Sequence, residues 1–178
     1  MPDELLDIVT EEDIVTHRAM RSVAHAQGLW HRGVHVFLLT RDGELLIQLR
    51  SKVRAQYPSV WDGSVSEHVK AGESYREAAR RGLLEELGVE GIDVQPLVKF
   101  RMNYGPNDNE ISTLFKGAVD PDRVRFDPGE IAQVDYLSLD KLLELMRRGD
   151  VAFSYWFIQL LRWYTIGLSD MVILPTDS

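Results

Sequence analysis

The segment from Ser74 to Gly88 carries a full set of α-helix signals and constrains the fold more than any other part of the chain. Its apolar residues recur at helical spacing, and they are Ala78, Ala79, Leu83, Leu84 and Leu87. Ser74 can cap the amino end, Glu77 can complete a capping box three residues later, and Gly88 can end the helix. The sequence therefore predicts a helix over 74–87.

Four apolar, β-rich runs predict strands, and they cover 35–39, 45–49, 94–102 and 111–119. Asp42-Gly43 separates the first two runs, which predicts an antiparallel hairpin, and a turn at 105–108 separates the last two. Ser138 caps a predicted helix over 139–148, and the apolar run 153–165 predicts a final, largely buried helix. These elements predict an α+β fold with helices packed on a mixed sheet.

The amino-terminal extension of about 30 residues is less informative. A short strand and turn fit 5–15, whereas 16–27 mixes charges and small residues and predicts no element. No linker, repeat or low-complexity segment divides the 178 residues. The sequence therefore predicts a single domain over 1–178.

The composition excludes several classes of protein. Since the chain has no cysteine, it has no disulfides, no thiolate metal site and no catalytic thiol. The formal net charge of -8 argues against a nucleic-acid binder, and an anionic substrate would need arginines or a metal ion. Residues 1–16 lack the features of a signal peptide, and no apolar run could span a membrane, so we expect a cytoplasmic protein.

The region 67–89 resembles the Nudix box of the Nudix hydrolase superfamily. Seven of the nine specified positions match, and these are Glu73, Arg81, Leu83, Glu85, Glu86, Gly88 and Val89. The resemblance implies the Nudix fold, a mixed β-sheet sandwiched between α-helices. It also implies that Glu85 and Glu86 bind Mg²⁺ or Mn²⁺ and act in catalysis, while Glu73 and Arg81 support the box. On composition alone, the same glutamates would fit a solvated, charged helix face.

Two positions depart from the box. Glu67 stands where the pattern has its opening glycine, and Gly82 stands where it has the glutamate that follows the arginine. The missing glutamate is normally a metal ligand, and a glycine inside a helix costs about 1 kcal/mol relative to alanine. The chain therefore either compensates for these differences or has changed its activity.

A second resemblance, to isopentenyl-diphosphate isomerases, covers most of the chain. In that branch three histidines and two acidic residues bind one metal ion, and the matching residues here are His25, His31, His68, Asp108 and Glu110. Imidazoles combined with carboxylates suit zinc, manganese or iron, so the resemblance implies a second, transition-metal site. Each histidine taken alone fits a structural role better.

Four further residues match substrate-binding positions of that branch. Arg50 and Arg54 resemble residues that contact phosphates, and Trp156 lies in a segment resembling one that presents an active-site tryptophan. Ser66 replaces the isomerase cysteine, and a hydroxyl is a much poorer acid and base than a thiol at neutral pH. This replacement disfavours the isomerase reaction. The arginines would equally fit solvent-facing charges, and Trp156 would fit plain core.

Three functions remain open. The leading hypothesis is metal-dependent hydrolysis of a small-molecule diphosphate, such as a nucleoside diphosphate derivative, with Glu110 or Glu130 as the base. Glu130 lies where many Nudix hydrolases place a catalytic glutamate on a loop, although a surface carboxylate in a turn fits better. The alternatives are an isopentenyl-diphosphate isomerase-like enzyme and a catalytically weakened diphosphate-binding module. A homodimer is compatible with the sequence, which leaves the oligomeric state open.

Overall fold

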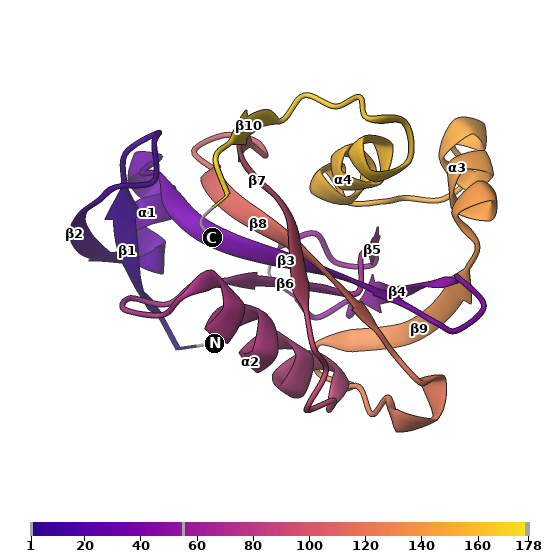
Figure 1. Cartoon of the computed structure of the whole chain (residues 1–178). Helices are drawn as coiled ribbons and strands as arrows, with labels where there is room; N and C mark the ends of the chain where they lie inside the picture. Colours follow the sequence, from indigo (N-terminus) through magenta and orange to yellow (C-terminus); the bar gives the residue numbers. More distant parts are fainter. Residues whose placement is uncertain (1, 55, 177–178) are drawn as a thin grey trace.

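The computed structural model describes residues 2–54 and 56–176, and Figure 1 shows their arrangement. The described strands are β1 (Leu5–Val9), β2 (Val15–Met20), β3 (His31–Leu39), β4 (Leu45–Arg50), β5 (Trp61–Asp62), β6 (Val65–His68), β7 (Gln95–Asn103), β8 (Asn109–Ala118), β9 (Ile131–Leu137) and β10 (Val172–Leu174). The helices are α1 (Arg21–Gln27), α2 (Tyr75–Leu87), α3 (Leu139–Arg148) and α4 (Tyr155–Ile166), with a 3-10 turn η1 (Pro121–Arg123). None of the helices in the described part of the chain is long and apolar enough to cross a membrane.

Strand β3 is the centre of one mixed sheet. One of its edges pairs in parallel with β8, and its other edge pairs in turn with β1, β6 and β4, all antiparallel. Beyond β8 follow β7 and β10, and beyond β4 follow β5 and β9. Because β3 pairs with four strands, the side chains at its start meet residues from β1, β6 and β8, which lie far apart in the sequence.

The helix predicted over 74–87 is present as α2, with the expected caps. Ser74 accepts a hydrogen bond from the Glu77 amide, the Glu77 side chain accepts one from the Ser74 amide, and Gly88 has a left-handed φ of 65°. The buried face of α2 packs on β3 and β6 through residues that include Val34, Val36, Val65, Ala78, Ala79, Leu83 and Leu87. Leu84 differs from the expected apolar stripe, because it is 47% exposed.

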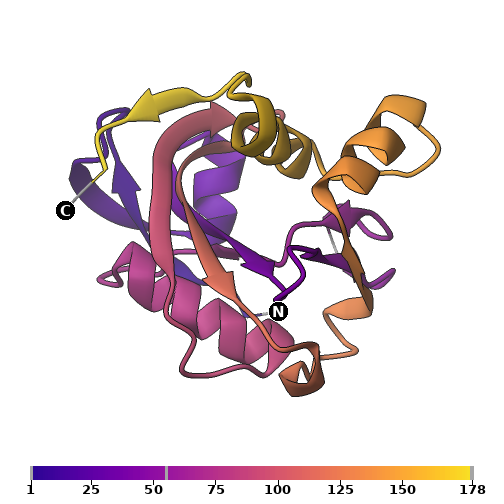
Figure 2. The same cartoon turned by 45° about the vertical axis from the view of Figure 1, so that its right-hand side comes forward.

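Helix α4 covers the opposite face of the sheet, and α3 lies beside β4 and β9 (Figures 1 and 2). Successive side chains of β3 alternate between the two layers: Val34, Val36 and Leu38 face α2, whereas Phe37 and Leu39 face α4. Both faces of the strand are covered, so it is apolar along most of its length. The expected α+β fold, a mixed sheet between helices, is confirmed.

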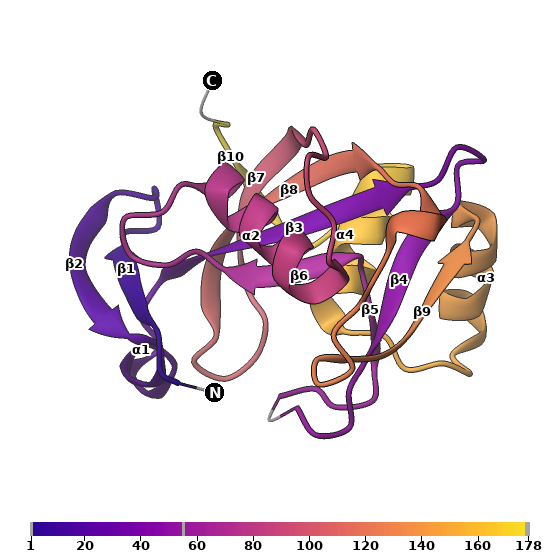
Figure 3. The ribbon, with the colours of Figure 1, turned by 90° about the horizontal axis from the view of Figure 1, so that it is seen from below.

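The predicted hairpin between 35–39 and 45–49 forms only at its turn. β3 and β4 pair at Leu39 and Leu45, and beyond this point β3 continues beside β6 and β8 while β4 continues beside β9 (Figure 3). The Asp-Gly signal marked the reversal correctly, but the extended pairing was wrong. Both strands are apolar on both faces, so their sequences do not select one neighbour over another.

The stretch 5–27 contains β1, β2 and α1, of which the sequence indicated only the first strand. Most of β2 is exposed, so no alternation of buried residues marks it. Helix α1 buries only Ala24 and ends at Gly28, which has a φ of 66°. This short helix nevertheless brings Arg21 and His25 to the edge of the sheet.

Candidate functional site

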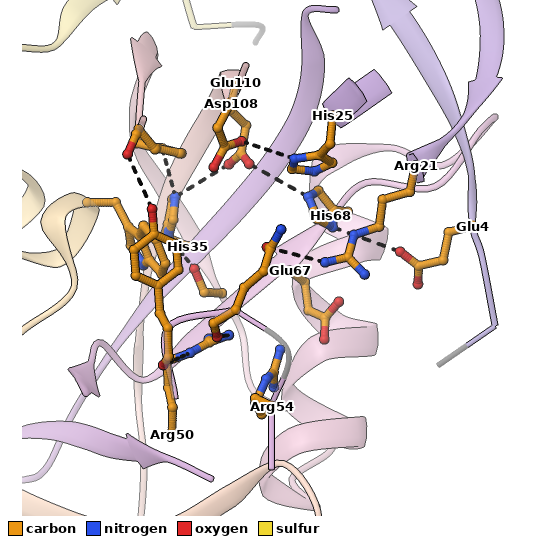
Figure 4. A pocket seen from close by; sticks show the side chains of 15 residues that line it. Glu4, Arg21, His25, His35, Arg50, Arg54, Glu67, His68, Asp108 and Glu110 are labelled. Carbon is orange, nitrogen blue, oxygen red and sulfur yellow. Dashed lines mark hydrogen bonds and ion pairs between the residues drawn. The ribbon is translucent and has the colours of Figure 1, made fainter. Parts of the chain in front are cut away.

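A cavity beside β3, β6 and the start of β8 collects residues that lie far apart in the sequence (Figure 4). The predicted site residues that line it are His25, Arg50, Arg54, Ser66, His68, Asp108, Glu110 and Trp156. The predicted residues outside this lining are His31, Glu73, Arg81, Glu85, Glu86 and Glu130. The lining also contains residues that the sequence did not identify as ligand-binding, among them Arg21, His35, Glu67 and Tyr104.

Three histidines and two acidic residues meet at one end of the cavity. This histidine cluster consists of His25, His31, His68, Asp108 and Glu110. The centres of the three imidazole rings lie 4.9, 5.2 and 5.5 Å apart. The nearest oxygens of Asp108 and Glu110 lie 3.9 and 3.7 Å from His31 Nε2. Figure 4 shows His25, His68, Asp108 and Glu110 on the side of the cavity opposite Arg50 and Arg54.

The register of β3 explains why these side chains meet. β3 pairs His31 with Glu110 of β8 and Gly33 with His68 of β6. A Cβ atom on Gly33 would lie 1.9 Å from Glu110 Oε1, so only glycine leaves room for the Glu110 side chain to cross the strand. The sequence reasoning missed Gly33, although a glycine inside a strand is a signal of such close approach.

Several polar atoms of the histidine cluster are buried without a hydrogen-bond partner, namely His25 Nε2, His31 Nε2 and Asp108 Oδ1. His31 Nδ1 donates to the Leu29 carbonyl at 3.0 Å, and burial lowers the pKa of His31 to about 4, so Nε2 carries a lone pair. Atoms that ligate one ion at about 2.1 Å lie within about 4.2 Å of each other. The 3.7 and 3.9 Å separations around His31 meet this limit. The donor set fits a divalent transition metal.

Arg81 fastens the loop that precedes α2 to the helix. Its guanidinium donates to both carboxylate oxygens of Glu73, at 2.8 and 3.0 Å, and to the His68 carbonyl at 2.7 Å. Glu85 lies one helical turn further on, 3.3 Å from the same guanidinium, with 52% of its side chain exposed. Glu73 and Arg81 are thus placed to support the box, while Glu85 extends toward solvent.

Glu86 points into the protein, unlike its neighbour Glu85, and is only 1% exposed. One carboxylate oxygen accepts a hydrogen bond from Gln48 Nε2 at 3.3 Å, and the other, Oε2, has no partner. Burial, followed by the negative charge of Glu67, raises the pKa of Glu86 well above its ordinary value. Gln48 was missed by the sequence reasoning, although a polar residue inside the apolar run 45–49 could have identified it.

Glu67 lies against Gly82 on the α2 side of β6, whereas Ser66 and His68 point to the cavity face. A Cβ atom on Gly82 would lie 2.7 Å from Val65 Cγ1 and 2.9 Å from Glu67 Cγ. The Glu67 carboxylate reaches the cavity and lies 3.5 Å from Arg81 Nη1. Burial raises the pKa of Glu67 to about 7. We refer to Glu67, Glu85 and Glu86 as the box site.

Arg50 and Trp156 form one wall of the cavity beside the buried Asp62. Trp156 Nε1 donates to Asp62 Oδ1 at 2.9 Å, and the Arg50 guanidinium lies 5.9 Å from the centre of the Trp156 ring. Arg50 also donates to the carbonyls of Gln56 and Tyr57, at 3.0 and 3.1 Å. Since these bonds occupy much of its guanidinium, Arg50 shapes the wall more than it offers charge to a ligand.

Arg54 and Arg21 are the guanidinium groups that an anion in the cavity could engage. Arg54 forms an ion pair with Glu130, one of the two candidate bases, and Arg21 lies 3.5 Å from Gln56 Oε1. Glu130 therefore contacts the cavity-lining residue Arg54 but does not line the cavity itself. Arg21 was missed because it belongs to the stretch 16–27, for which the sequence predicts no element.

Ser66 begins a chain of hydrogen bonds that ends at the histidine cluster. Its hydroxyl lies 2.7 Å from His35 Nδ1, and His35 Nε2 lies 3.1 Å from the Tyr104 hydroxyl. Tyr104 reaches Ser112 at 3.3 Å, and Ser112 donates to Glu110 at 2.6 Å. Burial lowers the pKa of His35 to about 3, so its ring is neutral. This chain was not predicted, because it depends on the register of β3 with β6 and β8.

Comparisons with known proteins identify the family of this chain. The chain matches the NUDIX domain family over residues 29–157. It is 38% identical over 124 residues to an uncharacterized Nudix hydrolase of Streptomyces coelicolor, a match that covers 67% of this chain and 68% of the relative. It is 26% identical over 161 residues to an isopentenyl-diphosphate Delta-isomerase of Pectobacterium atrosepticum, covering 88% of this chain and 89% of the relative.

Solved structures share the fold. The crystal structure of DR0079 from Deinococcus radiodurans superposes with a TM-score of 0.76 at 28% identity, covering 89% of this chain and 98% of that protein. A MutT protein from Methanosarcina mazei superposes with a TM-score of 0.62 at 20% identity, covering 77% of this chain and 96% of that protein, which shows the fold alone. The chain belongs to the Nudix superfamily, in the branch that includes the isopentenyl-diphosphate isomerases.

Proposed function

We propose that this protein is a metal-dependent hydrolase of a diphosphate linkage in a small molecule. The observation that carries the proposal is the buried Oε2 atom of Glu86, which has no hydrogen-bond partner. The charge of Glu86 interacts with those of Glu67 and Arg54, both of which line the cavity. A buried carboxylate stays ionised only when a cation or hydrogen bonds compensate it. Carboxylate ligands favour Mg²⁺ and Mn²⁺, so we assign the box site to one of these ions.

Different residues around the cavity would bind the metal ion, bind the phosphates and accept a proton during hydrolysis. A divalent ion in the box site would neutralise diphosphate charge and favour attack of water on phosphorus. Arg54 would hold phosphate oxygens, since its planar guanidinium can donate to two of them. A phosphate on Arg54 competes with Glu130, which leaves the Glu130 carboxylate free to take a proton from water. Glu110 is the alternative base, although its Oε1 already accepts a hydrogen bond from Ser112.

The proposal is tested with a panel of nucleoside diphosphates, nucleoside diphosphate derivatives and isoprenoid diphosphates. With Mg²⁺ or Mn²⁺ present, we expect release of phosphate or of a monophosphate from at least one class, and no release after treatment with chelator. If no compound is hydrolysed while some of them raise the melting temperature of the protein, the chain is a diphosphate-binding module and not a hydrolase.

An isopentenyl-diphosphate isomerase-like reaction is the second candidate, and the geometry of the histidine cluster favours it. Its weakness is Ser66, whose hydroxyl stands beside the neutral His35 where isomerases carry a cysteine. Uptake of deuterium from heavy water into isopentenyl diphosphate would establish the reaction. The absence of uptake by protein loaded with zinc or manganese would exclude it.

A further inference from the structure

We propose that Glu67 is a cation ligand and supplies the carboxylate that the Nudix box usually carries at the position of Gly82. The two departures from the box, Glu67 and Gly82, are then linked: a glutamate on β6 replaces the glutamate that the box usually has on α2. The inference rests on the proposed function, because it assigns a further ligand to the same metal site.

The space around Gly82 makes the two positions depend on each other. Gly82 is buried in the middle of α2, and a Cβ atom there would lie 2.9 Å from Glu67 Cγ and 2.7 Å from Val65 Cγ1. Carbon atoms in contact are normally about 3.5–4.0 Å apart. A side chain at position 82 would therefore displace both Val65 and Glu67, and a glutamate at 67 leaves room only for glycine at 82. No positive φ explains Gly82, since its backbone is ordinary helix.

The Glu67 carboxylate reaches the neighbours that a glutamate at position 82 would have. Position 82 follows Arg81 and precedes Glu86 by one helical turn, so a side chain there would share a face with Glu86. Glu67 approaches from β6, where it pairs with Val34, and its Oε2 lies 3.5 Å from Arg81 Nη1. Its negative charge also acts on Glu86.

Glu86 gives independent evidence that these carboxylates hold a ligand. It is 1% exposed, and its Oε2 makes no hydrogen bond. Glu67 keeps 17% of its side chain exposed and lines the cavity, so an ion has access to it. A divalent cation between the two residues would satisfy the Oε2 atom of Glu86 and remove the repulsion between the carboxylates. Arg81 does not do this, because its Nη1 atom donates to Glu67 and Glu85, and its hydrogen bonds within the described residues do not reach Glu86.

The test measures Mg²⁺ binding without substrate, by calorimetry and by the rise in melting temperature that Mg²⁺ causes. Mg²⁺ is the probe because imidazole ligands, such as those of the histidine cluster, select other metals. One variant is Glu67→Gln, which keeps the shape of the side chain. The other is the reciprocal double variant Glu67→Gly/Gly82→Glu. Glu90→Gln, which changes an exposed carboxylate just beyond α2, is the matched control.

We expect Glu67→Gln to weaken Mg²⁺ binding by about tenfold or more. The double variant should bind Mg²⁺ more tightly than Glu67→Gln once Val65 shifts, because Val65 Cγ1 lies 2.7 Å from a Cβ atom at position 82. Gly82→Glu alone should lower the melting temperature, because its side chain collides with Val65 and Glu67. Wild-type Mg²⁺ affinity in Glu67→Gln would overturn the assignment, and so would the absence of Mg²⁺ binding by the wild type. If the double variant does not fold, Glu67→Gln decides alone.

The failure of this inference differs from the failure of the proposed function. If the wild type hydrolyses a diphosphate and Glu67→Gln binds Mg²⁺ normally, Glu67 is not a ligand and the hydrolase stands. If Glu67→Gln loses Mg²⁺ binding but the wild type hydrolyses nothing in the panel, Glu67 is a ligand and the hydrolase is excluded.

Discussion

The two faces of β6 contribute side chains to two different sites that contain acidic residues, the histidine cluster and the box site. His68 belongs to the histidine cluster, where imidazole nitrogens and carboxylate oxygens are mixed, whereas the preceding residue, Glu67, belongs to the box site, where only carboxylates are present. Nitrogen ligands suit transition metals, and carboxylates suit Mg²⁺ or Mn²⁺. Adjacent residues of one short strand can therefore serve two metal chemistries, because successive side chains point to opposite faces.

The two sites also differ in how they are assembled. The glutamates at positions 85 and 86 belong to one helix whose caps lie within the same segment. The histidine cluster draws on α1, β3, β6 and the start of β8, and it depends on strand register. A local change in packing should therefore disturb one site and spare the other.

The largest expected effect comes from Glu86→Gln in the box site. The loss of a buried carboxylate should lower diphosphate hydrolysis by roughly 100-fold or more. Without metal the variant should be at least as stable as the wild type, because the raised pKa of Glu86 means that its charge opposes folding at neutral pH. Steady-state kinetics and metal-free urea unfolding measure the two effects. The control is Glu90→Gln, which changes an exposed carboxylate just beyond α2; an equal loss of activity in this control would contradict a specific role for Glu86.

The next largest effect should separate the histidine cluster from the box site. In Gly33→Ala the new methyl group displaces Glu110, and affinity for a transition metal should fall by roughly 10- to 100-fold. Elemental analysis of protein purified without chelator measures this loss, while the Mg²⁺-induced rise in melting temperature should remain. Ser112→Ala removes only one hydrogen bond to Glu110 and should cost less. Loss of both metal responses in Gly33→Ala would show that the sites are not separable.

The arginines should show where a diphosphate approaches the two sites. Arg54→Lys loses the planar fork and should raise KM by about tenfold, with little change in melting temperature. Arg50→Lys should instead lower the free energy of unfolding by about 1–3 kcal/mol, because it loses bonds to the Gln56 and Tyr57 carbonyls. Kinetics and thermal melts of both variants make the comparison, and the reverse pattern would place the phosphates on Arg50.

The smallest expected effect concerns His35, a buried imidazole outside the histidine cluster that faces Ser66, Tyr104 and Glu110. Its folded-state pKa of about 3 lies below the ordinary 6.5, so the unfolded chain binds more protons between these values. The stability that it contributes is complete above pH 6.5 and is lost as the pH falls. His35→Asn should reduce the pH dependence of the free energy of unfolding by roughly 1 kcal/mol per pH unit between about pH 4 and 6.

Urea unfolding in chelator measures this slope, and His17→Asn on the exposed strand β2 is the matched control. An unchanged slope in His35→Asn would mean that burial alone does not keep the imidazoles of this region neutral. The neutral state of the histidine cluster would then need another cause.

The sequence predicted α2 well because every signal that fixes it is local. Ser74, Glu77 and Gly88 determine the helix from within one segment, and the structure has the same caps. The signals for the hairpin were equally local, but they determine only the reversal at Asp42-Gly43. The partners beyond the turn depend on competition among apolar strands, which a single segment does not encode.

The candidate site was predicted as a set of residues but not as an arrangement. The resemblance identified His25, His31 and His68, and the fold brings them together. The residues that make room for or orient the others, such as Gly33 and Gln48, were missed. Their roles depend on which atoms lie across the strand, and this is fixed only by tertiary contacts.

The late position of Trp156 in the sequence determines when the wall of the cavity can form during synthesis. The residues that line the cavity extend from Glu4 to Trp156, and the box helix is complete long before the last of them is made. A ribosome-bound chain that lacks α4 would carry the glutamates and histidines but leave Asp62 without its tryptophan partner. Because a domain generally folds as a unit, we expect the wall of the cavity to form only after the segment that carries Trp156 has been made.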